Sequence, residues 1–493
     1  MQLVWFRQDL RLHDHTALWH ARQSGPTVAF IALSPQQWAL HDDAAIKIDC
    51  YLRQLHILRQ QLDTLNIPLI IQHIPLWSGI AHTLGEICME LKIKQVHAHV
   101  ELGVNELRRD AQVQQQLEQQ GISVQLYHDR TLFPVGSIRN QSNKPYQVFG
   151  AFKKSCYERL SISIPSCYPA IDAQTALAKH ALWQTPFTLD DFYSAKISAE
   201  QQTLWPMSEA HAQHCLDEFM AHGLAHYADE RDFPALNSTS RIGLYLNLGI
   251  LSIRQCLQAL FREQNGYFHL EGKGQQTWLD ELLWREFYQH ILFDFPRVSK
   301  HQPFQIKTAR IAWRDAPQDL EAWQQGQTGI PIVDAGMRQL LATGWMHNRV
   351  RMICAMFLSK NLLIDWRLGE QWFMQHLVDG DLAANNGGWQ WCASTGTDAV
   401  PYFRIFNPIS QSQKFDAQGD YLRQWLPELA HLDAKQIHAP YAKNLQLDLN
   451  YPKPIVDLKQ SRLRAIEVFK ALSGDVYIAQ TEQYYAYFQR SER

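Results

Sequence analysis

The chain has 493 residues, of which 46% are hydrophobic and 19% are charged, a balance typical of soluble globular proteins. This length exceeds what one hydrophobic core supports, so we expect two domains. The net charge of −3 argues against a uniformly basic nucleic-acid binder, so any DNA-binding surface must gather its positive charge on one face.

Residues 1–130 alternate short β-rich runs with amphipathic helical stretches at about 44–66, 77–92 and 104–119. The predicted buried strands are Leu3–Phe6, Thr27–Leu33, Pro68–His73, Gln95–Val100 and Ile122–Tyr127. Strand–helix alternation predicts a parallel, doubly wound sheet, which places ligands beyond the carboxyl ends of its strands. The first strand is followed by RQDLRLHD rather than G-x-G-x-x-G, so we expect no dinucleotide site of that type.

The rest of the chain reads as a connector and a helical domain. Ser, Pro and Ala accumulate between residues 131 and 200, as in a long surface connection, and residues 201–480 carry helical spacing with many aromatic residues. We therefore predict an α/β domain at 1–130, a connector at 131–200 and an all-α domain at 201–480.

The cysteines and the apolar runs indicate a cytoplasmic protein. The eight cysteines show no C-x-x-C pair and no regular spacing, which argues for reduced thiols and against a zinc site or a disulfide framework. The histidines near residues 211–214 lack companion spacing, so we expect no metal. The apolar run Leu3–Phe6 before Arg7 is too short for a secretory signal, and no run of about 18 apolar residues predicts a membrane span.

The stretch 278–288 (WLDELLWREFY) carries unusual side chains at helical spacing. Glu281, Trp284 and Tyr288 fall at i, i+3 and i+7, on one helix face. An acid, an indole and a phenol make a poor core face and a good wall for a ligand the size of a base. The alternative is a solvated amphipathic face, which seldom carries two tryptophans.

The stretch 334–360 predicts a second helix, in which polar residues interrupt a strongly apolar segment. Asn348 and Met352 are i,i+4 neighbours that can share one pocket. A buried arginine requires a carboxylate partner, and for Arg351 we expect Asp379 or Asp381.

Two further segments are rich in polar groups. Residues 239–243 (TSRIG) combine hydroxyls, backbone amides and an arginine at an expected helix start, a combination that suits a pyrophosphate, although Ser and Thr cap many helices. Residues 379–416 begin with two aspartates and run through Asn-Asn-Gly-Gly, which predicts irregular backbone rather than helix.

These segments occur in one recognisable order. WFRQDLRLHD, RDFP, TSR, WREFY, GWMHNRVRM, DGDLAANNGGWQW and FRIFNP lie between residue 2 and about residue 456. The chain thereby resembles the photolyase/cryptochrome family, and most closely the bacterial cyclobutane pyrimidine dimer photolyases. The resemblance implies an α/β antenna domain and an all-α FAD-binding domain in a monomer. It also implies light-driven electron transfer from reduced FAD to a dimer flipped out of UV-damaged DNA.

The resemblance assigns roles to individual residues. Those implied to bind FAD are Tyr227, Thr239, Ser240, Arg241, Ile242, Gly243, Trp278, Arg351, Asp379, Gly380, Asp381 and Asn385. Within this set, Asn385 should face flavin N5 and Arg351 should pair with Asp379. Gly243 stands where close relatives of the family carry serine. The residues implied to carry electrons to the flavin from the surface are Trp313, Trp366 and Trp389.

Further residues match the lesion site and the DNA surface. The implied dimer pocket and catalytic set comprises Glu281, Trp284, Asn348, Met352, Asn385 and Trp391. The implied DNA contacts are made by Arg231, Glu281, Trp284, Arg285, Tyr288, Asn348, Arg404 and Gln411. We expect Glu281 to lie in a partly desolvated pocket as a neutral acid that donates to a thymine carbonyl.

A second chromophore is implied by an antenna pocket. His41, Asn105, Glu106 and Lys300 match a 5,10-methenyltetrahydrofolate site, with 8-hydroxy-deazaflavin as the alternative. Ser299 replaces a cysteine found in a relative. From the residues alone, each of the first three is better explained as a helix cap or a solvated residue.

Three other functions compete with dimer repair. A cryptochrome-type blue-light photoreceptor would share the fold without repair, and a (6-4) photoproduct photolyase would require a histidine pair where this chain has Asn348 and Met352. A hydrolase using Asp379 and Asp381 as acid and base would leave the tryptophans unexplained.

Overall fold

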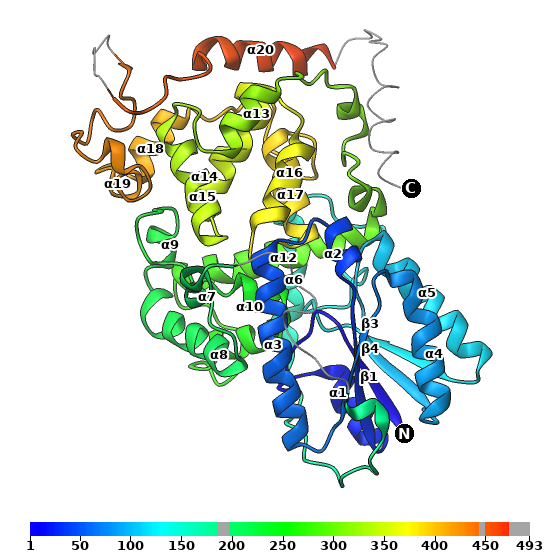
Figure 1. The fold of residues 1–493 in the computed structure, drawn as a ribbon. Coiled ribbons are helices and arrows are strands. Elements are labelled where there is room, and N and C mark those ends of the chain that lie inside the picture. Colours follow the sequence, from blue (N-terminus) through cyan, green and yellow to red (C-terminus); the bar gives the residue numbers. More distant parts are fainter. Residues whose placement is uncertain (185–196, 443–448, 473–493) are drawn as a thin grey trace. The chain divides into compact units, whose positions relative to one another are not determined.

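The computed structural model describes residues 1–184, 197–442 and 449–472 (Figure 1). The chain divides into two compact units. The first unit comprises residues 1–231, 238–296 and 374–384, and the second comprises 232–237, 297–373 and the residues from 385 onward. Each unit is described by itself below.

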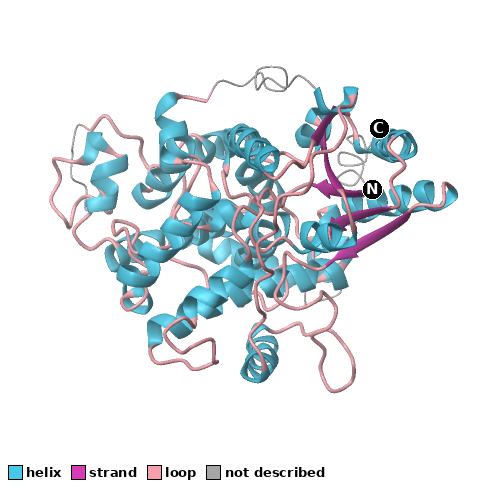
Figure 2. Ribbon diagram, turned by 90° about the horizontal axis from the view of Figure 1, so that it is seen from below, coloured by secondary structure: helices cyan, strands magenta, loops and turns pink. Residues whose placement is uncertain are grey.

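A five-stranded parallel sheet forms the centre of the first unit, and its strands are the magenta arrows in Figure 2. The strands are β1 (Gln2–Phe6), β2 (Thr27–Leu33), β3 (Leu69–His73), β4 (Gln95–His99) and β5 (Ser123–Tyr127). Their order is β3-β2-β1-β4-β5, so the direction of winding reverses between β1 and β4. All five predicted strands are confirmed, each to within one residue of its expected bounds.

Helices cover both faces of this sheet because β1 presents alternate apolar side chains to each side. Val4 and Phe6 belong to one core with α1 (Thr16–Ser24) and α3 (Ala45–Thr64). Leu3 and Trp5 belong to a second core. That core contains side chains of α4 (Ile80–Glu90) and α5 (Val104–Gln119), and a short helix, α2 (Pro35–Leu40), follows β2. The helices expected between the strands are confirmed.

The first unit also contains helices outside the sheet layers. They are α6 (Phe149–Ile162), α7 (Ala199–Leu204), α8 (Glu209–Glu218), the π-helical turn η4 (Phe219–Gly223), α9 (Tyr227–Glu230), α10 (Gly243–Asn247), α11 (Ile253–Leu260) and α12 (Lys273–Asp294). Helix α12 packs against α6 and α9. Gly249 follows α10 with φ +64°, and a Cβ there would lie 2.4 Å from the carbonyl oxygen of Gln8. Only glycine allows this close approach between the helical segment and the loop after β1.

The described residues of the second unit form helices joined by loops and turns. Its elements are α13 (Pro317–Gln324), α14 (Pro331–Thr343), α15 (Asn348–Met356), the π-helical turn η7 (Phe357–Leu362), α16 (Trp366–His376), α17 (Leu382–Ala393), α18 (Pro408–Phe415), α19 (Asp420–Trp425) and α20 (Leu458–Ala471), of which α16 and α17 each extend partly into the first unit.

Two predictions about this part of the chain are wrong. Residues 334–360 do not form one helix, because α14 ends at Gly344, whose left-handed conformation (φ 72°, ψ 11°) closes the helix. Residues 382–393 are helical despite their Asn-Asn-Gly-Gly run. Tertiary hydrogen bonds hold the start of this helix: the side-chain amides of Asn385 and Asn386 donate to Glu370 of α16, over 2.9 and 2.8 Å. These contacts override the poor helix propensity of the four residues.

The predicted fold class is confirmed. A doubly wound parallel sheet occupies the N-terminal part, and the described residues between 197 and 472 form helices and turns without a strand. No helix in the described part of the chain is long and apolar enough to cross a membrane. All eight cysteines are free. The domain boundaries at 130 and 200 remain a prediction, and residues 185–196 and 473–480 of the predicted domains lie outside the described residues.

Candidate functional site

Helix α12 forms an aromatic and charged wall in the first unit. The indole of Trp284 is stacked on the ring of Phe149, with centroids 3.7 Å apart and an angle of 11° between the planes. Tyr288, one turn further along α12, lies 5.6 Å from the same indole. Phe149 is buried whereas Trp284 remains partly exposed. The indole therefore has one face covered by the protein and keeps solvent access for a flat ligand.

Glu281, on the same helix, is paired with a cation. Arg231 donates through Nη1 to Oε1 of Glu281 over 2.6 Å, and both side chains are partly exposed. The structure thus places a cation beside Glu281, and its role as a neutral acid stays a prediction. The pair thus offers both an acceptor and a donor beside Trp284.

The residues expected to hold a pyrophosphate lie around the start of α10. Tyr227 is buried on α9, and Trp278 is buried on α12. Arg241 adopts φ +50° just before Gly243, the first residue of α10, so the helix start expected here is confirmed. A Cβ at Gly243 would lie 3.1 Å from Oδ2 of Asp379. The absence of a side chain at residue 243 leaves this carboxylate room beside the backbone amides of the turn.

Asp381 is the most constrained residue of the Asp379-Gly380-Asp381 segment. Its Oδ2 accepts from Arg130 over 2.5 Å, and Oδ1 caps α17 by accepting from the backbone N–H of Ala384 over 2.9 Å. Burial alone would raise the pKa of Asp381, but the Arg130 and Arg285 guanidinium groups outweigh it and lower the pKa to about 2. Arg130, in the loop after β5, was not found by sequence reasoning because it belongs to no motif.

Gly380 is held through its backbone. Its carbonyl oxygen accepts from Nζ of Lys47 over 2.9 Å and from Nδ2 of Asn247 over 2.6 Å. Lys47 belongs to α3 and Asn247 to α10, so the segment between Asp379 and Asp381 is fixed from the α/β part and from the helical part of the same unit.

Arg285, next to Trp284 on α12, is partly exposed. Its Nη1 donates to the carbonyl oxygen of Arg130 over 2.6 Å, and it lines a small pocket together with Arg7, Glu101 and Asp129. Burial lowers the pKa of the Arg285 guanidinium. The contact of Arg285 with DNA stays a prediction.

The amide of Asn385 has a defined orientation in the second unit. Its Nδ2 donates to the backbone carbonyl of Glu370 over 2.9 Å. A carbonyl oxygen only accepts, so Nδ2 must face Glu370 and Oδ1 must face away. The neighbouring Asn386 donates to the buried Oε1 of Glu370 over 2.8 Å and accepts from Gln390. This chain of bonds fixes the start of α17 and presents Asn385 as an acceptor.

Helix α15 presents the other expected lesion residues. Asn348 is exposed, and Met352 follows one turn later on the same face, partly exposed. Arg351 donates through Nε to the carbonyl oxygen of Met346 over 2.7 Å, and its pairing with Asp379 stays a prediction. The remaining expected residues of this unit are Trp391 and Gln411, both partly exposed, and Arg404, which is exposed.

The three expected relay tryptophans lie in the second unit. Trp366 and Trp389 are buried, whereas Trp313 is partly exposed. Trp389 packs directly on α16: a Cβ at Gly369, one turn after Trp366, would lie 2.1 Å from the Trp389 ring. The buried Nε1 of Trp389 has no hydrogen-bond partner among the described residues. Its surroundings are edge-on aromatic rings, Phe373 at 4.9 Å and Trp323 at 5.9 Å.

Of the expected antenna residues in the first unit, His41 and Asn105 are in contact. Nε2 of His41 accepts from Nδ2 of Asn105 over 3.1 Å and lies 3.0 Å from Nε2 of Gln37. The ring of His41 meets Trp77 edge-on at 4.7 Å. Burial lowers the pKa of His41. Sequence reasoning missed Gln37 and Trp77.

Glu106 and Lys300 complete the predicted antenna set. Glu106 lies in the first turn of α5, and burial together with the nearby Glu101 carboxylate raises its pKa to about 7. A neutral carboxyl can donate as well as accept, which suits a ligand ring with both kinds of polar atom. Lys300 is exposed in the second unit.

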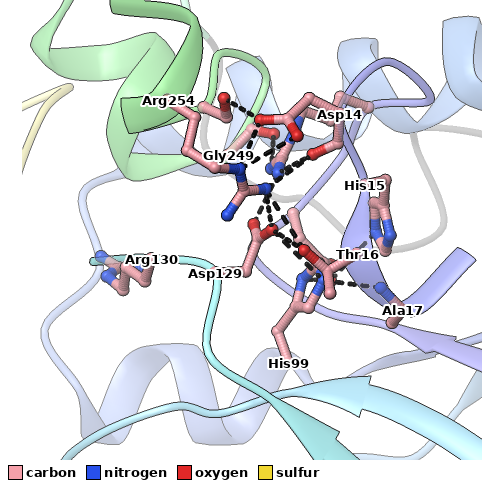
Figure 3. A network of polar contacts seen from close by, with 12 residues as sticks. Asp14, His15, Thr16, Ala17, His99, Asp129, Arg130, Gly249 and Arg254 are labelled. Carbon is pink, nitrogen blue, oxygen red and sulfur yellow. Dashed lines mark hydrogen bonds and ion pairs between the residues drawn. The ribbon is translucent and has the colours of Figure 1, made fainter. Parts of the chain in front are cut away.

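A buried polar network at the carboxyl ends of the strands has the residue types of a metal site (Figure 3). Nε2 of His15 and Nδ1 of His99 both face Oδ2 of Asp9, at 3.3 and 2.7 Å. However, Nδ1 of His15 accepts from the backbone N–H of Leu18, and Nε2 of His99 accepts from that of Ala17. A neutral imidazole that accepts at one nitrogen carries its proton on the other. Both nitrogens that face Asp9 therefore carry a proton, which leaves neither of them a lone pair for a metal ion.

The same network ties the helical segment to the sheet within the first unit. Arg254, on α11, donates to Asp129 over 2.5 Å and to Asp14 over 2.9 Å, as Figure 3 shows. Arg11 donates to the other oxygen of Asp129, also over 2.5 Å, and to the carbonyl of Gly249 over 3.0 Å. These buried charges are all paired, as burial requires.

Two family models match the chain. Residues 2–170 match the family described as DNA photolyase, and residues 278–471 match the FAD binding domain of DNA photolyase. Two curated bacterial proteins named deoxyribodipyrimidine photo-lyase align over 475 residues. The one from Salmonella typhimurium is 43% identical and the one from Escherichia coli 41%, with 95% of this chain and 98% of each relative covered. The chain belongs to the DNA photolyase family.

Solved structures of the photolyase family share the fold. A class III photolyase from Agrobacterium tumefaciens superposes with a TM-score of 0.82 at 33% identity, covering 96% of this chain and 97% of the other. A cryptochrome from Synechocystis also gives a TM-score of 0.82, at 29% identity, with 95% of this chain and 99% of the other covered. The fold therefore does not separate repair from photoreception, and the side chains of the site must decide between them.

Proposed function

We propose that this protein is a carbon–carbon lyase that repairs cyclobutane pyrimidine dimers in UV-damaged DNA in a light-dependent reaction. The observation that carries the proposal is the wall on α12, where Trp284 keeps solvent access beside the Arg231–Glu281 pair. The two curated relatives named deoxyribodipyrimidine photo-lyase support it, because they align over nearly their whole length.

FAD is the cofactor implied by the domain match, and when reduced and excited by light it supplies the electron that splits the dimer. The donor set of the chain suits this molecule. Turn 239–243 offers hydroxyls and backbone amides for phosphates, and the carboxylates of Asp379 and Asp381 suit ribityl hydroxyls and ring N–H groups. The full proposed set is Tyr227, Thr239, Ser240, Arg241, Ile242, Gly243, Trp278, Arg351, Asp379, Gly380, Asp381 and Asn385.

Asn385 is proposed to accept a hydrogen bond from flavin N5–H. Its Nδ2 is used by the carbonyl of Glu370, so only Oδ1 remains to face a ligand. An acceptor at this place favours a flavin that carries a proton on N5 over one that does not. Asn385 thereby contributes to keeping the cofactor in a form that can donate an electron.

The lesion is proposed to stack on the indoles of Trp284 and Trp391. Stacking on an aromatic side chain is worth about 1–3 kcal/mol per base, which can offset the cost of unstacking a base step that the lesion has already weakened. Glu281, Asn348 and Met352 contribute polar and soft apolar contacts to the pyrimidine rings. Arg231 neutralises the carboxylate beside the lesion and orients it.

Phosphate and base contacts outside the pocket are proposed for Arg231, Arg285, Tyr288, Arg404 and Gln411. All five are at least partly exposed. Binding should therefore weaken with salt despite the net charge of −3, by a log–log slope of about −0.9 per phosphate neutralised.

Trp389, Trp366 and Trp313 are proposed to pass electrons inward from the surface. The indole N–H of Trp389 has no acceptor among the described residues, so an oxidised Trp389 has no base to take its proton and keeps its positive charge. The charge can then move outward to Trp366 and to the partly exposed Trp313.

A second chromophore is proposed at His41, Asn105, Glu106 and Lys300. The bonded amide–imidazole pair and the carboxyl with its raised pKa suit the pterin ring of 5,10-methenyltetrahydrofolate, with 8-hydroxy-deazaflavin as the alternative. We also propose that the protein is a cytoplasmic monomer.

Substrate specificity tests the proposal against its two closest alternatives. In the dark, the purified protein should bind duplex carrying one cyclobutane dimer much more tightly than the undamaged duplex or one carrying a (6-4) product. A photoreceptor would show no preference for the dimer, and a (6-4) photolyase would prefer the other lesion. An absorption spectrum without bound flavin would refute all three.

A further inference from the structure

Lys360 is a fully buried lysine on the π-helical turn η7. π-Helical turns are rare and are frequently found at functional sites. The turn is closed by Leu363, a non-glycine residue in the left-handed conformation with φ 53°. Packing alone does not account for a buried lysine at a backbone irregularity of this kind, which points to a functional role for this residue.

The ammonium group of Lys360 is held without a carboxylate. Nζ donates to Oγ of Ser394 over 2.8 Å and lies 3.5 Å from the centroid of the Phe469 ring. It forms no ion pair with any described residue. Buried lysines normally have an acidic partner, because burying an unpaired charge is costly. Packing alone would favour methionine or leucine at this position.

Phe469 links this charge to an indole of the proposed relay. The ring of Phe469, on α20, contacts Trp313 edge-on at 6.4 Å between centroids. Because Nζ lies 3.5 Å from the same ring, the charge lies within about 10 Å of the Trp313 indole. The path between them is an aromatic ring rather than water, so the interaction is weakly screened.

We propose that Lys360 is a positioning residue that sets how readily Trp313 is oxidised, by holding a positive charge against the Phe469 ring that contacts Trp313. The inference rests on the proposed relay of Trp313, Trp366 and Trp389. Lys360 would act through Phe469 and would contact neither the flavin nor the DNA.

The redox step itself is simple. Oxidation of Trp313 removes one electron from its indole, which passes inward through Trp366 and Trp389 to the oxidised flavin. The indole radical cation releases its N–H proton to water, since Trp313 is partly exposed. A thiol in solution, the reductant of the assay, returns the electron. A charged Lys360 opposes the step because it adds a second positive charge beside the radical cation.

The charge on Lys360 changes within the physiological range. Burial lowers its pKa from 10.5 to about 7, so Nζ is charged below that pH and neutral above it. Other charged groups near the turn are fixed by partners. Arg314 pairs with Asp319, and Arg464 donates to the carbonyl of Asn361. Burial raises the pKa values of the nearby thiols, that of Cys392 to about 12 and that of Cys354 well above its usual range, so both stay protonated.

The test compares wild type with Lys360→Met, which has no charge, and Lys360→Arg, which is always charged. Photoreduction of the oxidised flavin with a thiol reductant is followed between pH about 6 and about 9. As the pH increases, the photoreduction rate of wild type should rise from that of Lys360→Arg to that of Lys360→Met. The expected rise is roughly tenfold for a unit charge about 10 Å away at an effective dielectric constant of about 20. Lys459→Met, which removes an exposed lysine of α20, is the matched control and should behave as wild type.

Two readouts separate this inference from the relay on which it rests. Transient absorption should show a longer-lived Trp313 radical cation in Lys360→Met than in Lys360→Arg, and NMR of the Lys360 ε-carbon should titrate near neutral pH. Wild-type photoreduction that does not change with pH, or equal behaviour of the two variants, overturns the role of Lys360. If Trp313→Phe still photoreduces its flavin, the proposed relay is wrong. If Trp313→Phe loses photoreduction but both Lys360 variants behave as wild type, only the role of Lys360 is wrong.

Discussion

The indole of Trp284 lies parallel to the ring of Phe149, with ring centroids 3.7 Å apart and an angle of 11° between the planes. Phe149 begins α6, so a helix of the connector supports the residue on which we expect the lesion to stack. Phe149→Ala removes this support. Because an aromatic pair is worth about 0.5–1.5 kcal/mol beyond its buried area, we expect dark binding of dimer-containing duplex to weaken up to roughly tenfold.

Flavin content should not change in Phe149→Ala, because no flavin contact is proposed for α6. Phe268→Ala is a suitable control, since Phe268 contacts Tyr157 and Phe261 and not the stacked pair. Wild-type affinity for the dimer in Phe149→Ala, measured by equilibrium binding, would show that the stack does not position Trp284.

A second prediction concerns Glu281 and its partner. Glu281→Ala removes a carboxylate 2.6 Å from Arg231. We expect retained flavin and retained dark binding, with fewer dimers split per absorbed photon, because a polar contact to the reacting pyrimidine is lost. Repair at the wild-type quantum yield would refute the catalytic role of this carboxylate.

A third prediction follows from the buried pair of Arg130 and Asp381. Arg130→Met leaves the Asp381 carboxylate buried without its closest cation, and breaking such a pair costs about 3–5 kcal/mol. The pKa of Asp381 is about 2 in the folded protein, against an ordinary value of 3.8 for the unfolded chain. The pair therefore stabilises above pH about 4, and its contribution is lost as the pH falls toward 2.

Urea unfolding checks this prediction at two pH values. The stability lost in Arg130→Met should be largest near neutral pH and should shrink toward pH about 4, where the freed carboxyl protonates. Adding Asp381→Asn should recover part of it. Arg53→Met, which breaks the pair with Asp49 on α3, should not interact with Asp381→Asn. A loss that is independent of pH would contradict the electrostatic account.

A fourth prediction tests the packing of the relay. Gly369→Ala places a methyl group 2.1 Å from the ring of Trp389 and 2.6 Å from Leu358, so one of them must move. We expect a loss of about 1–3 kcal/mol in the free energy of unfolding and slower photoreduction of oxidised flavin. Gly150→Ala in α6, where a Cβ meets nothing within 4 Å, should keep both the stability and the photoreduction rate of wild type. Photoreduction at the wild-type rate in Gly369→Ala would count against electron transfer through Trp389.

The sequence predicts those features that depend on local periodicity. Strands β1–β5 alternate with helices at spacings that leave little choice of topology, and Glu281 and Trp284 share a face because a helix has 3.6 residues per turn. Helix α6 could also have been predicted from the sequence, because its buried residues recur at helical spacing: Phe149, Phe152, Cys156 and Leu160. The Ser, Pro and Ala of the connector obscure this signal.

Other features depend on contacts between distant segments and could not be predicted. Arg130 and Asp381 are 251 residues apart in the chain, and neither shows its partner in its own surroundings. The helix at 382–393 contradicts local propensity because Glu370 bonds Asn385 and Asn386 from α16. The orientation of the Asn385 amide likewise follows from a backbone carbonyl that no motif reveals.

Light-driven loss of cyclobutane dimers tests the central claim most directly. Protein with chemically reduced flavin is mixed with a dimer-containing oligonucleotide, and intact dimers are counted after near-UV or blue illumination and after an equal time in the dark. We predict that dimers disappear in the light, are converted to the original pyrimidines and persist in the dark. Flavin-loaded protein that binds this DNA but leaves the dimers intact under illumination would contradict the account.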